Sequence, residues 1–77
     1  MKLKGLFEVT AIKSKTSAKG FDKLETGDEI MVIYKLSGSH GYAPYIEVTF
    51  SYDNSTVKKS AKQLKSILES FELIQKY

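Results

Sequence analysis

Residues 29–36, which read Glu-Ile-Met-Val-Ile-Tyr-Lys-Leu, decide the fold of this chain. The run is apolar on both sides of a period-two pattern, because Met31 and Ile33 alternate with other apolar residues. A short run of this kind is typical of a strand in the middle of a sheet. We therefore predict a central strand over 29–36, with a core face that consists of Ile30, Val32, Tyr34 and Leu36.

A hairpin is predicted from this strand to Tyr52. Residues 37–44 form a glycine-rich connection that ends at Pro44, and these residue types favour turns. Alternation resumes over 45–52, as expected for an antiparallel partner strand. The side chains predicted to point inward are Ile46, Val48, Phe50 and Tyr52.

A first strand and a long loop are predicted before the hairpin. The segment 13–20 is polar and has no periodicity, and Phe21 and Leu24 then precede a turn at 26–28. A loop of this length in a small domain is usually functional or disordered. The strand is predicted over 6–12, with Phe7, Val9 and Ala11 on one face and Leu6, Glu8, Thr10 and Ile12 on the other.

A turn, a short strand and a helix are predicted after the hairpin. Residues 53–55 are a turn signal, because Asp and Asn tolerate left-handed backbone, and 56–58 fit a short edge strand. Ser60 and Gln63 have the spacing of a capping box at the start of a helix. Residues 71–77 fit either the end of this helix or another edge strand. The predicted apolar stripe of the helix comprises Ala61, Leu64, Ile67, Leu68 and Phe71.

These elements predict a single α+β domain over residues 1–77. The simplest arrangement is an antiparallel sheet of about four strands covered on one face by a C-terminal helix. A small, partly open β-barrel with a C-terminal helix is the alternative. Because so short a chain buries only about 60–65% of its unfolded surface, formation of a homodimer is a further expectation.

The composition excludes several classes of site. The chain has no cysteine, so disulfides and thiolate zinc sites are excluded, and its one histidine, His40, cannot replace them. We expect no cofactor and no metal. There is no Gly-x-Ser-x-Gly elbow and no phosphate-binding glycine loop, so we expect a protein without catalytic activity. Asp28 and Glu29 could form a metal site with Asp22, but we interpret the Asp28-Glu29 pair as a Gly-Asp turn followed by the start of a strand. No apolar run resembles a signal peptide or a membrane span, which predicts a cytoplasmic protein.

Charge is the strongest functional signal. All twelve basic residues are lysines, and the two ends of the chain are basic whereas the middle is acidic. Lysine attracts phosphate as a point charge, whereas arginine supplies the planar group used to recognise bases. The pattern therefore predicts sequence-nonspecific contact with phosphates. Eight of the lysines form two clusters, Lys13, Lys15, Lys19 and Lys23, and Lys58, Lys59, Lys62 and Lys65.

Each cluster has two interpretations. Lys58 and Lys59 precede a predicted helix N-terminus, where a phosphate would offset their repulsion from the helix dipole, or they simply protect an edge strand from pairing. In the loop Lys13–Lys23, Phe21 is either a platform on which a base stacks or a core residue.

The loop 37–45 is a candidate interaction surface. Tyr42 and Tyr45 offer large contact areas with few rotatable bonds, and His40 would make binding sensitive to pH. The alternative is an ordinary hairpin loop with one tyrosine packed on the sheet.

The function expected from these features is a small nucleic-acid-binding protein that prefers single strands. The candidate contacts are Lys13, Lys15, Lys19, Lys58, Lys59, Lys62 and Lys65, with Phe21 as a stacking residue. The alternative is a protein-interaction module, such as the inhibitors or adaptors that phages and mobile elements encode, with His40, Tyr42 and Tyr45 in its contact surface.

In general layout the chain is similar to the positive-cofactor-4-like single-strand binders. The likeness rests on strand order and on the passage 56–60, Thr-Val-Lys-Lys-Ser, which leads into Leu64, Ile67 and Leu68. The resemblance implies a helix after a four-stranded antiparallel sheet, and a dimer. One departure is that Glu8, Glu29 and Glu47 are predicted on the sheet face away from the helix, where they would repel phosphates.

Overall fold

A computed structural model describes residues 4–35 and 45–77 of the chain. The predicted α+β class is confirmed, with five strands, one α-helix and a short 3-10 helix in these residues. In chain order the elements are β1 (Gly5–Ile12), η1 (Phe21–Lys23), β2 (Glu29–Lys35), β3 (Tyr45–Phe50), β4 (Thr56–Lys59), α1 (Ala61–Leu68) and β5 (Phe71–Gln75).

The sheet is antiparallel and open, with strand order β4-β3-β2-β1-β5. β2 lies in the middle, as the apolar run at 29–36 predicted. The hairpin is also confirmed, because Ile30 pairs with Phe50 and Tyr34 with Ile46. β4 and β5 form opposite edges of the sheet, so the barrel alternative is wrong.

The C-terminal segment forms a strand rather than the end of the helix. β5 pairs with β1, which raises the number of strands from the predicted four to five. Phe71 is buried, but it lies in β5 and not on the helical stripe, and Ala61 is exposed. Pairing with β1 gives backbone groups of β5 hydrogen-bond partners. If the helix continued instead, the carbonyl groups of its last turn would have no partner within the helix. This fifth strand also departs from the layout of the positive-cofactor-4-like proteins.

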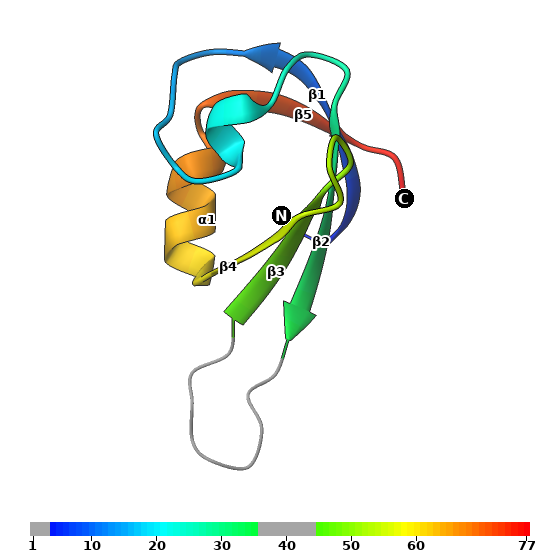
Figure 1. The fold of residues 1–77 in the computed structure, drawn as a ribbon, viewed down its shortest axis with the longest axis vertical. Coiled ribbons are helices and arrows are strands. Elements are labelled where there is room, and N and C mark those ends of the chain that lie inside the picture. Colours follow the sequence, from blue (N-terminus) through cyan, green and yellow to red (C-terminus); the bar gives the residue numbers. More distant parts are fainter. Residues whose placement is uncertain (1–3, 36–44) are drawn as a thin grey trace.

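The helix begins as the sequence predicts. The Ser60 hydroxyl accepts a hydrogen bond from the Gln63 N–H at 3.2 Å, and the Gln63 side chain accepts one from the Ser60 N–H at 3.1 Å. Leu64 and Leu68 then point into the core. Figure 1 shows that α1 and the segment 13–24 lie on the same side of the sheet. We call this side the helix side, and the opposite face of the sheet the outer face.

The core lies on the helix side, between the sheet and the layer formed by α1 and the segment 13–24. Phe21 and Leu24 are buried with Leu64 and Leu68 against the inward side chains of the sheet. Those inward side chains are Phe7, Val9, Ile30, Val32, Ile46, Val48, Phe50 and Phe71.

Two side chains, Tyr34 and Tyr52, differ from the predicted core faces, and a third predicted core residue, Leu36, is not tested. Tyr34 is 44% exposed, and Leu36 lies outside the described residues. β3 ends at Phe50, so Tyr52 belongs to the following turn, where Asn54 adopts the left-handed backbone expected of it with φ of 61°. Tyr52 nevertheless packs, since its ring stacks on Phe50 at 5.5 Å.

No helix in residues 4–35 and 45–77 has the length and apolar character needed to span a membrane.

A β-bulge corrects the predicted faces of β1. The pairing with β5 shifts between Val9 and Ala11, so that Ala11 pairs with Glu72 and Ile12 with Phe71. The extra residue reverses the alternation beyond it. As a result Ile12, and not Ala11, shares the face of the buried Phe71.

Candidate nucleic-acid interface

The structure brings most of both lysine clusters to the helix side. The backbone N–H groups of Lys13 and Ser14 donate to the carbonyl oxygen of Ser70, at 2.8 and 3.2 Å. Ser70 follows the helix that carries Lys62 and Lys65. The first basic segment therefore starts next to the C-terminal end of α1. The second basic segment leads into the N-terminal end of the same helix. No sequence pattern indicated this connection.

Adjacent lysines in β4 point to opposite sides of the sheet. Lys59 pairs with the inward-facing Ile46, and with Lys62 it lines a shallow hollow of about 380 Å³ on the helix side. Lys58 pairs with Glu47 on the outer face, and its Nζ lies 5.2 Å from the centre of the Tyr45 ring. Lys58 is thus separated from the other predicted contacts, because successive residues of a strand alternate between faces.

The start of α1 is unusually positive. Its first turn contains no acidic residue and includes Lys62, whereas acidic residues are favoured at this end of a helix. The Ser60 hydroxyl already occupies the Gln63 N–H, so the amide groups of Ala61 and Lys62 are the ones left for an anion.

Acidic residues near these lysines mostly stabilise turns. Asp22 accepts a hydrogen bond from the Gly20 N–H at 3.1 Å, and Asp28 accepts one from the Glu25 N–H at 2.8 Å. Asp53 accepts one from the Ser55 N–H at 2.9 Å, and hydrogen bonds from Ser55 lower the pKa of Asp53. The turn interpretation of Asp28 is therefore confirmed, and no cluster of potential metal ligands occurs in the described part of the chain.

Phe21 is a core residue and offers no stacking surface. It is 1% exposed and meets Phe50 edge to face, with ring centres 5.0 Å apart. The Tyr52 hydroxyl donates to the Gly20 carbonyl oxygen at 2.7 Å and fastens the same loop. The stacking role predicted for Phe21 does not fit this position, whereas the alternative core interpretation does.

The predicted interaction loop is only partly described. His40 and Tyr42 lie outside the described residues. Tyr45 is half-buried at the start of β3, next to Lys58.

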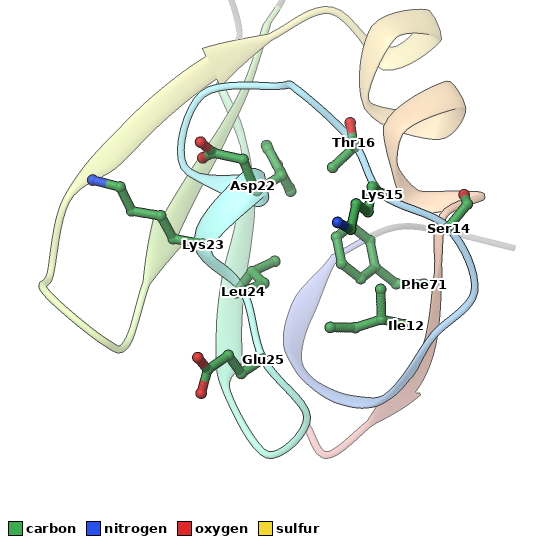
Figure 2. A pocket seen from close by; sticks show the side chains of 10 residues that line it. Ile12, Ser14, Lys15, Thr16, Asp22, Lys23, Leu24, Glu25 and Phe71 are labelled. Atoms are coloured by element: carbon green, nitrogen blue, oxygen red, sulfur yellow. The ribbon is translucent and has the colours of Figure 1, made fainter.

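A second hollow on the helix side was not anticipated from the sequence. It has a volume of about 450 Å³ and lies between the segment 12–16 and the segment 21–25. Figure 2 shows Ile12, Lys15 and Phe71 along one wall and Leu24 across from them, while Lys23 and Glu25 point away. Ile12 reaches this hollow because of the β-bulge in β1, and the alternation of residues 6–12 gives no sign of that bulge.

The outer face has a different character. The Lys76 ammonium bridges Glu8 at 2.9 Å and Glu29 at 3.0 Å, and these hydrogen bonds, the one to Glu8 above all, raise the pKa of Lys76. Met31 and Ile33 are 37% and 40% exposed on the same face. This face combines apolar side chains with carboxylates that have lysines beside them, because Lys76 bridges Glu8 and Glu29 and Lys58 lies opposite Glu47.

Comparisons with known proteins add no functional information. No family model matches the chain, and the searches of curated proteins and of solved structures found no match either.

Proposed function

We propose that this protein is a non-catalytic, sequence-nonspecific nucleic-acid-binding protein of the cytoplasm that contacts phosphates through the lysines of its helix side. The observation that supports this most directly is the backbone hydrogen bond from Lys13 to Ser70, which places the start of the first basic segment beside the end of the helix that carries Lys62 and Lys65. The contacts proposed are Lys13, Lys15, Lys19, Lys59, Lys62 and Lys65.

The charge distribution supports this orientation. The first turn of α1 contains Lys62 and no acidic residue, and Asp22 and Asp28 bind backbone amides in local turns. On the outer face Lys76 pairs with Glu8 and Glu29 and Lys58 lies opposite Glu47, so lysines and carboxylates offset one another there. A phosphate backbone is attracted to lysines and repelled by carboxylates, so it would lie across the helix side.

Fluorescence anisotropy with labelled single-stranded and duplex oligonucleotides tests the proposal. We expect binding to weaken with salt, with a log-log slope of about 0.7 per phosphate contacted on single strands. A Lys62→Gln/Lys65→Gln variant should bind roughly tenfold more weakly and lower that slope by about 1 to 2.

The matched control is a Lys35→Gln/Lys58→Gln variant, which loses the same net charge from the outer face. It should keep most of the affinity, because these lysines lie away from the helix side. Equal losses in the two variants would show that net charge alone drives binding, and absence of binding at low salt would exclude the function.

A second candidate function is protein–protein interaction through the outer face. The observation that favours it is the exposure of Met31 and Ile33 side by side on β2, together with Ile74, which is 50% exposed on β5. Exposed apolar side chains that share one sheet face are typical of contact surfaces. The inhibitor or adaptor role with its loop at 37–45 stays a prediction, since most of that loop lies outside the described residues.

The charges of β2 make a second copy of the chain a suitable partner. Glu29 begins the strand and Lys35 ends it, both on the outer face, with Met31 and Ile33 between them. When two outer faces stack with their β2 strands antiparallel, Lys35 of each copy lies over Glu29 of the other. The face measures roughly 20 by 20 Å, about half of the 800 Å² that each partner of a stable complex buries, so the dimer should be weak.

Sedimentation velocity over a concentration series at low salt tests this second candidate. The mass should rise towards that of a dimer at high concentration, and an Ile33→Glu variant should stay monomeric while it still binds oligonucleotides. A monomer at every concentration would exclude the dimer and leave the nucleic-acid proposal unaffected.

A further inference from the structure

The hollow beside the first basic segment has the features of a small binding site. Its volume of about 450 Å³ falls within the range of about 300–1,000 Å³ seen for small-molecule sites. Its walls include Ile12, Leu24 and Phe71, which are apolar. Leu24 and Phe71 are buried, whereas Ile12 is 45% exposed, so its side chain can contact a ligand.

The β-bulge explains why Ile12 faces this hollow. Without the register shift between Val9 and Ala11, the alternation of β1 would direct Ile12 to the outer face. The bulge places it opposite Phe71 instead. Bulges are frequent next to functional sites because they redirect a side chain at little cost to the rest of the strand.

The charges around the hollow suit a ligand that is apolar in the middle and anionic at its edge. Lys15 lies along the same wall as Ile12 and Phe71, whereas the charged ends of Asp22, Lys23 and Glu25, which also line the hollow, point away from that wall (Figure 2). The Lys13 side chain lines a separate hollow with Leu68 and Phe71, so Lys15 is the cation on this wall. A nucleotide fits this description, because its base has flat π faces that pack on apolar side chains and its phosphate is an anion.

We propose that the hollow binds one unpaired nucleobase of a bound strand, with the base packed against Ile12 and the adjacent phosphate near Lys15. The proposal rests on the nucleic-acid function proposed above and adds a preference to it. A base inside a duplex cannot enter without leaving its stack, which costs free energy. The hollow would therefore supply the single-strand preference that Phe21, being buried, cannot.

The test compares a labelled single strand of thymidines with an abasic strand of the same length, which keeps every phosphate and lacks every base. We expect the strand with bases to bind roughly fivefold or more tightly to the unmodified protein. An Ile12→Ser variant should lose that advantage and keep its affinity for the abasic strand. Ile74→Ser is the matched control, because Ile74 is similarly exposed but lies on the outer face.

Equal affinity for the two strands, or an advantage that survives in Ile12→Ser, would overturn the proposal. Methyl NMR during titration with adenosine monophosphate separates it from the wider function. A shift of the Ile12 methyl signals without a shift at Ile74 supports the base site even if long strands fail to bind. Unchanged Ile12 signals, or shifts produced by inorganic phosphate alone, exclude a base in the hollow.

Discussion

The backbone N–H of Lys13 donates to the carbonyl oxygen of Ser70 at 2.8 Å, across 57 residues of sequence. Through this contact the loop after β1 is fixed beside the end of α1. Two basic segments from opposite ends of the chain consequently share one side of the protein. The proposed phosphate contacts depend on this arrangement rather than on any local motif.

Ser60→Ala should destabilise the protein by about 1 kcal/mol, because the Ser60 hydroxyl caps α1 and its loss leaves the Gln63 N–H without this acceptor. Urea unfolding measures the change. Ser66→Ala is the control, since Ser66 is an exposed residue inside the same helix and alanine is the better helix former there. Equal stability of the two variants would contradict the importance of the cap.

Gly20→Ala should destabilise the protein by about 1–3 kcal/mol, because Gly20 has φ of +87° and a methyl group there would overlap the Phe50 ring. Thermal unfolding provides the measurement. Gly27→Ala separates the two causes, since Gly27 also has a positive φ, +99°, but open space around it. Gly27→Ala should lose less stability than Gly20→Ala. An equal loss of stability would mean that the overlap with the Phe50 ring does not matter.

Lys76→Met should lower the stability of the protein at neutral pH. Glu8 and Glu29 are cross-strand partners, and Lys76 bridges their carboxylates. Without the ammonium group the two negative charges lie opposite each other with no cation between them, which destabilises the strand pair. Melting temperatures of both proteins at neutral pH measure this difference.

In the wild-type protein the same ion pairs predict a loss of stability at high pH. Because the carboxylates raise the pKa of Lys76, its contribution to stability is fully present below the ordinary lysine pKa of about 10.4. The contribution is lost as pH rises through the higher folded pKa. A melting-temperature difference between wild type and Lys76→Met that stayed constant from acid to strong alkali would contradict this role.

Local sequence patterns predicted much of the fold. The alternation at 29–36 and 45–52 identified the central hairpin, and the spacing of Ser60 and Gln63 identified the start of the helix. These features depend on neighbouring residues, whose periodicity and capping chemistry can be recognised in sequence. The turn at Asn54 was predictable for the same reason.

Non-local pairing decided what the sequence could not predict. The sequence pattern placed Phe71 on the helical stripe, but Phe71 lies in β5 and pairs with Ile12 of β1. The bulge that makes this register possible cannot be recognised in the alternation of residues 6–12. Lys58 and Lys59 are neighbours in sequence, yet they lie on opposite faces because β4 is a strand. Phe21 was recognisable only as an aromatic in a polar loop, and its contact with Phe50 determines its burial.

Titration of an isotopically labelled sample with a short single strand, followed through backbone amide NMR signals, tests whether the two basic segments form one binding surface. Residues 13–19 and 59–65 should shift together with one midpoint, while outer-face residues of β2 and β3 should change little. Shifts confined to one of the two segments, or centred on the outer face, would contradict a shared lysine surface on the helix side.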